Sequence, residues 1–64
     1  MDKILEKLPE LHRTMVRHTL DAITNEKDRE TRRVFGAWLK GQADILLADG
    51  LIEVDDYLLM VRTK

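Results

Sequence analysis

Residues 34–50, VFGAWLKGQADILLADG, decide the fold expected of this 64-residue chain. Apolar residues recur there at spacings of three and four, which is the period of an α-helix. The stripe expected to be buried comprises Val34, Phe35, Trp38, Leu39, Ile45 and Leu46. Gly50 then suits the left-handed position that ends a helix. We therefore predict a long helix from about Asn25 to Ala48, with Asn25 as its N-cap and Asp28 in the capping-box position.

The helical period continues on both sides of this stretch. Pro9 suits the first turn of a helix, and the apolar residues after it, as far as Ile23, keep the same spacing. Residues 2–8 predict a short N-terminal turn, and a short C-terminal helix is expected from about Asp55, its cap. No segment alternates with period two for long enough to indicate a strand. The prediction is a single all-α domain over residues 1–64, a small helical hairpin or bundle of three to four helices.

A chain of this size can build only a small core, so its stability depends on close helix packing or on association. Domains of this size bury only about 60% of the surface of the unfolded chain, and the sequence contains no cysteine for a disulfide. Gly36 and Gly41 lie in the long helix within lines of small residues, where another helix backbone could approach closely. That helix is either the one from Pro9 or a second copy. We expect a homodimer, with the interface residues Val34, Trp38, Gly41 and Ile45.

Residues 49–60, DGLIEVDDYLLM, contain the densest group of acidic residues. A calcium loop requires glycine at its sixth position and glutamate at its twelfth, and a count from Asp44 or from Asp49 does not provide them. A turn between two helices explains the residues better, with Gly50 ending one helix and Asp55 starting the next. The pattern resembles the turn of small bacterial helical-hairpin modules, including the short C-terminal domains called SHOCT. The resemblance covers only these twelve residues; it implies a helical hairpin and no activity.

Groups that could perform catalysis are scarce. Serine and cysteine are absent, so the usual acyl-transfer nucleophiles are missing. His18 and Asp21 are three residues apart, but zinc would require three or four ligands. No phosphate-binding glycine loop, dinucleotide fingerprint or HExxH motif occurs. We expect no enzymatic activity, no cofactor, no metal and no small-molecule substrate.

The distribution of charge leaves a second function open. The formal net charge is −1, but residues 1–40 carry nine Lys or Arg against seven Asp or Glu. The basic residues that could contact nucleic acid lie on the two longer helices: Arg13, Arg17, Arg29, Arg32, Arg33 and Lys40. Ion pairs expected between Asp28 and Arg32, and between Arg17 and Asp21, would instead make them ordinary surface residues.

Two functional hypotheses follow from these patterns. The first is a small regulatory or accessory protein, of a kind found in bacteria and phages, that acts by protein–protein contact as a homodimer. The alternative is a DNA-binding regulator that uses the basic residues. No apolar stretch approaches the roughly 20 residues of a membrane span, and the start of the chain lacks the apolar segment of a signal peptide. A cytoplasmic location is expected.

Overall fold

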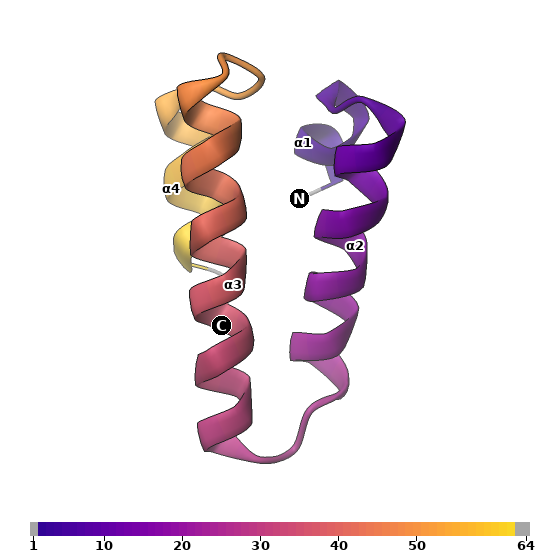
Figure 1. Cartoon of the computed structure of the whole chain (residues 1–64), viewed down its shortest axis with the longest axis vertical. Helices are drawn as coiled ribbons and strands as arrows, with labels where there is room; N and C mark the ends of the chain where they lie inside the picture. The colour runs from indigo at the N-terminus through magenta and orange to yellow at the C-terminus, as the bar shows by residue number, and fades with distance from the viewer. Residues whose placement is uncertain (1, 63–64) are drawn as a thin grey trace.

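The computed structural model describes residues 2–62, which form four helices connected by short turns (Figure 1). Their bounds are α1 Asp2–Lys7, α2 Glu10–Asn25, α3 Arg29–Ala48 and α4 Val54–Arg62. No strand occurs within residues 2–62. The predicted all-α fold is confirmed, and so is the short first helix.

The helix α3 lies at the centre of the packing. It forms an antiparallel hairpin with α2, and α4 folds back along α3 and lies behind it in Figure 1. The short α1 packs against α2. The molecule is elongated along the hairpin, with extents of 33 × 19 × 16 Å. One face of the hairpin therefore carries the two shorter helices.

The core lies between these helices and is made of aliphatic side chains. Helix α3 contributes Leu39, Ala43 and Leu46, which share one side of it. The remaining core residues are Ile4, Leu5, Leu8, Val16, Ile23, Ile52 and Met60. The buried stripe predicted for α3 is thus confirmed for Leu39 and Leu46.

Three of the other four residues of that stripe were predicted wrongly. Val34, Trp38 and Ile45 are exposed, and Phe35 is only partly buried. The physical reason is that the other helices cover one side of α3 and not the other. Helices α2 and α4 pack on either side of Leu39 and Leu46, and no described helix packs on the side where Val34, Trp38 and Ile45 lie.

The α2–α3 turn is capped differently from the prediction. Asn25 is the last residue of α2, and Asp28 is the N-cap of α3. The Asp28 carboxylate accepts hydrogen bonds from the Thr31 backbone N–H at 3.0 Å and from the Thr31 hydroxyl at 2.7 Å. These bonds lower the pKa of Asp28. Asn and Asp both suit an N-cap, and the connection through residues 26–28 gives that role to the second of them.

The α3–α4 turn confirms the role of Gly50, whose φ is +74°. The Leu51 N–H donates to the Leu46 carbonyl at 3.0 Å and the Gly50 N–H donates to the Leu47 carbonyl at 3.1 Å, which together form a Schellman motif. Ile52 then returns to the core. The cap of α4 differs from the predicted Asp55, because Asp56 instead accepts the Glu53 N–H at 3.0 Å, as the third residue of a capping box does.

Asp56 also connects the two ends of the described chain. Lys7 donates to its Oδ2 atom at 2.9 Å, which joins α1 to α4. The Lys7 hydrogen bond is the main cause of the lowered pKa of Asp56, and the same bond raises the pKa of Lys7. The acidic turn between α3 and α4 therefore supplies the partner that holds the N-terminal helix in place.

Candidate functional site

An exposed apolar stripe runs along α3. Val34, Trp38, Gly41 and Ile45 fall within an arc of about 60° at 100° per residue. Val34 is 49% exposed, Trp38 57% and Ile45 59%. Gly41 is also exposed. These four residues, the α3 stripe, are the ones predicted from the sequence as an interface, and the structure places them together on one surface.

The indole of Trp38 is held in position by its neighbour. Its ring lies against Phe35 with centroids 5.1 Å apart and a tilt of 42° between the planes. Phe35 is partly buried and packs on the core. Aromatic pairs at this separation are mutually attractive. One face of the indole is therefore supported from within the chain, while the rest of the side chain remains open to a partner.

The glycines of α3 are not sites of close helix packing within the chain. A Cβ atom built on Gly36 or Gly41 would have nothing within 4 Å. Of the two alternatives for this line of small residues, the one in which α2 packs against it is therefore wrong. Instead α2 packs beside larger side chains such as Leu39 and Leu46, because burying them removes more apolar surface from water.

Helix α2 extends the apolar surface. Leu11 is 70% exposed and Met15 49%, and they are one helical turn apart. Met15 and Ile45 both line a hollow of about 100 Å³ between α2 and α3. We call the α3 stripe together with Leu11 and Met15 the open face.

Gln42 lies in the same hollow with an unsatisfied polar group. Its Oε1 atom is buried and has no hydrogen-bond partner among the residues that the structure describes. A buried acceptor without a partner destabilises the folded chain. The hollow at the edge of the open face is therefore not optimised for the stability of the single chain.

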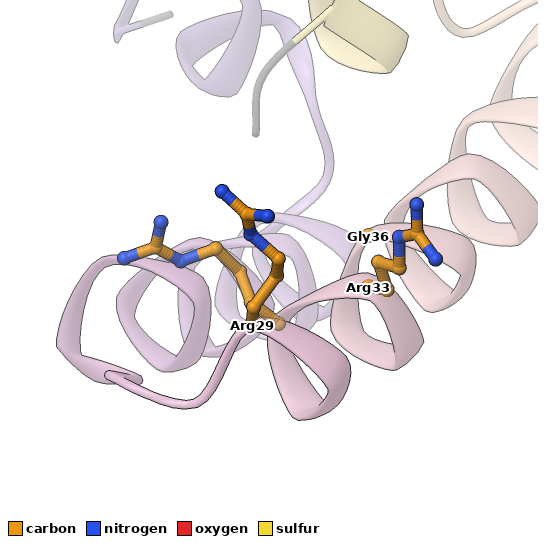
Figure 2. A pocket seen from close by; sticks show the side chains of 4 residues that line it. Arg29, Arg33 and Gly36 are labelled. Atoms are coloured by element: carbon orange, nitrogen blue, oxygen red, sulfur yellow. The ribbon is translucent and has the colours of Figure 1, made fainter.

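Three arginines surround a second hollow, of about 400 Å³, at the start of α3 (Figure 2). Its lining consists of Arg29, Arg32, Arg33 and Gly36. The Arg32 guanidinium donates to the Glu26 carbonyl at 3.0 Å and not to the Asp28 carboxylate, so the ion pair predicted for it is absent. The guanidinium groups of Arg29 and Arg33 form no hydrogen bond or ion pair within residues 2–62. The nearby acids Glu26 and Asp28 accept backbone N–H groups instead.

The other three predicted basic residues do not line this hollow. Lys40 pairs with Asp44 at 3.1 Å. The Tyr57 hydroxyl donates to Asp44 at 2.6 Å; this bond and the one from Lys40 lower the pKa of Asp44, and the pairing raises that of Lys40. Arg13 donates to the Leu8 carbonyl at 3.1 Å. Arg17 has no ion pair with Asp21, contrary to the prediction.

The described part of the chain contains no group of three or more His, Cys, Asp or Glu side chains placed to hold a metal ion. None of its helices is both long enough and apolar enough to cross a membrane. No protein-family model, curated protein or solved structure matches this chain. The open face and the arginine hollow are two surface features on which a function can be argued, beside the exposed apolar residues Val54, Leu58 and Leu59 of α4.

Sequence reasoning missed the α2 part of the open face. Leu11 and Met15 belong to the apolar pattern of that helix and were treated only as part of its amphipathic side. The signal that could have identified these two residues was the width of the apolar pattern around α2. The side chains of α2 that are buried, Val16, Thr19 and Ile23, occupy a narrow strip, so Leu11 and Met15 fall outside it.

Proposed function

We propose that this chain is a small, non-enzymatic interaction protein of the cytoplasm that acts by protein–protein contact, as a homodimer joined through the open face. The observation that supports this proposal is the exposure of Trp38, Ile45 and Val34 on a single stripe of α3. Contiguous exposed apolar surface on a small chain is typical of a binding surface. Tryptophan is also the residue type most enriched among those that dominate binding energy.

The magnitudes are compatible with an association of moderate strength. Complete burial of a large apolar side chain contributes about 1.5–3 kcal/mol, and the open face offers five such side chains that are only partly exposed. Association costs about 4–15 kcal/mol in lost translation and rotation. Both copies bury these side chains, so the gain is about twice that of one copy. A net gain of about 8 kcal/mol corresponds to a micromolar dissociation constant, so we expect a dimer that forms at micromolar concentrations and dissociates on dilution.

Light scattering coupled to size exclusion, at several concentrations, tests the homodimer. We expect twice the monomer mass at high micromolar concentration, and a loss of the dimer in Trp38→Ala and Ile45→Ala. Val54→Ala is the matched control, because Val54 is 61% exposed on α4, outside the open face. A wild-type chain that stays monomeric throughout would contradict the homodimer. Equal losses from the control would leave the homodimer standing and contradict the open face as its interface.

The arginine hollow supports a second candidate function, DNA binding. Three arginines line one hollow, and Arg29 and Arg33 have no carboxylate partner within residues 2–62. Arginine is well suited to phosphate oxygens and to guanine edges. Against this role, Lys40 is paired with Asp44 and Arg13 with the Leu8 carbonyl, so fewer cations are free than the sequence offers.

A fluorescence titration with duplex DNA at two salt concentrations tests the second candidate. Binding should weaken steeply with salt if phosphates are neutralised. It should also weaken when Arg29 and Arg33 are changed to Gln, and change little in Lys3→Gln, which removes a charge from α1 far from the hollow in the sequence. Absence of binding at low salt would eliminate this function.

A further inference from the structure

We infer that the two copies of the proposed homodimer pack their α3 stripes antiparallel, with Trp38 of each copy opposite Gly41 of the other. Val34 of each copy then lies opposite Ile45 of the other. This inference rests on the proposed function, because it takes from it the second copy as the partner of the open face and adds the direction in which that copy lies.

The spacing of the stripe is the first argument. The intervals from Val34 to Trp38, to Gly41 and to Ile45 are four, three and four residues. This order reads the same in both directions, so a two-fold axis near residues 39 and 40 superposes the stripe on its own reverse. A two-fold dimer uses the same patch on both copies, which requires such self-complementarity. Intervals of three and four are also those of helix pairs that interlock their side chains.

The sizes of the facing residues are the second argument. In the antiparallel pairing the largest side chain, Trp38, meets the smallest residue, Gly41, whose surroundings are empty within 4 Å of a built Cβ atom. In a parallel pairing with the same stripe, two Trp38 side chains would face each other and two Gly41 residues would leave a void. Interfaces, like cores, favour filled volume without overlap.

The support that Phe35 gives to Trp38 is the third argument. Because the two rings are already in contact within the chain, the indole has less freedom to lose on binding. It projects from α3 at 57% exposure and is available to cover a glycine on a partner. The two-fold axis also places the α2 helices of both copies on the same side of the α3 pair, where Leu11 and Met15 extend the contact.

Cysteine cross-linking tests the direction of packing, and the natural chain contains no cysteine to interfere. We expect mild oxidation of a mixture of Val34→Cys and Ile45→Cys to give a covalent dimer rapidly. Each variant alone should cross-link no faster than Val54→Cys, the control outside the open face. Rapid cross-linking of either variant by itself would overturn the antiparallel arrangement, because it would place like residues opposite each other.

Light scattering on the same samples separates two kinds of failure. A monomeric wild-type chain would contradict the homodimer itself. A wild-type dimer in which no pair of these cysteines cross-links faster than the control would leave the homodimer standing and overturn the α3 stripe as its interface.

A substitution at the predicted crossing provides a second test. Gly41→Leu fills the space that Trp38 of the second copy would occupy, so we expect the dissociation constant to rise at least about tenfold while the helical content is retained. Gly36→Leu is the control, since a Cβ atom there also has nothing within 4 Å and the residue lies off the stripe. Equal effects of the two substitutions would overturn the pairing of Trp38 with Gly41.

Discussion

Two sides of α3 differ in solvent exposure although both carry apolar residues at the same helical spacing. Leu39 and Leu46 are 1% and 2% exposed, whereas Trp38 and Ile45, each one residue earlier in the chain, are 57% and 59% exposed. A step of one residue turns a side chain by about 100° around the helix. That rotation carries it from the core, between α2 and α4, to a surface that no described helix covers.

The difference shows that apolar residues with helical spacing can line more sides of a helix than a single chain can bury. Helix α3 spans Arg29–Ala48 and carries apolar side chains around much of its circumference. Within residues 2–62, the helices α2 and α4 are the ones that pack closely along it. The remaining side of α3 carries apolar residues like those of the core, but no described helix covers them. The open face is therefore a candidate for binding.

The largest effect should come from truncating the covered side. We expect Leu39→Ala to lower the free energy of unfolding by about 2–5 kcal/mol, because it leaves a cavity in a core with few other residues. Trp38→Ala, measured by urea unfolding at concentrations too low for association, should have a much smaller effect. Comparable losses from both substitutions would mean that the two sides of α3 do not differ as described.

A gain of stability is expected at the boundary between the two sides. Gln42→Met removes the buried Oε1 acceptor that has no partner in the described chain and keeps a similar volume. The free energy of unfolding should rise by about 1–3 kcal/mol, since the desolvation penalty disappears. Chemical denaturation measures it. A decrease would indicate that the amide has a partner in solution, for example on a second copy.

A smaller gain is expected on the open side itself. Gly41→Ala should raise the free energy of unfolding of the monomer by about 0.5–1 kcal/mol, because alanine favours the helix and its Cβ has nothing within 4 Å. Gly36→Ala, in equally empty surroundings, should behave in the same way. Thermal unfolding at low concentration checks both. A loss at position 41 alone would reveal a neighbour that occupies this space.

The smallest expected effect concerns pH and the contacts at the ends of the helices. The pKa values of Asp28, Asp44 and Asp56 are lowered in the folded chain, so their contribution is present above the ordinary value of 3.8 and is lost as the pH falls through the lower folded values. The urea concentration at the midpoint of unfolding should therefore decrease as the pH is lowered below about 4. Asp56→Asn should weaken this dependence, and a pH profile identical to that of the wild type would contradict the role of the Lys7 contact.

The sequence predicted the helical segments because their signals are local. Pro9, Gly50 and the spacing of apolar residues indicate where helices run, and the backbone around Gly50 adopts the expected left-handed conformation. The residues that cap the helix N-termini were harder to predict. Asn25 and Asp28 are both good N-cap residues, and the choice between them depends on how residues 26–28 close the turn.

The candidate site was only partly predictable. The four residues of the α3 stripe were named from spacing, but three of the four had also been assigned to the buried stripe, and spacing alone could not separate the two. The basic residues show the same limit. Arg32 and Lys40 lie close together in the sequence, yet one donates to a backbone carbonyl and the other to Asp44.

The sequence by itself determined that the chain is helical, where its helices run, and that they carry more apolar surface than a short chain can bury. Those properties depend on neighbours within a few residues of each other, so local chemistry is sufficient for them. The tertiary structure decided which apolar residues are covered and which arginines are left without a partner. Coverage depends on how α2 and α4 pack around α3, and contacts between distant segments determine that packing.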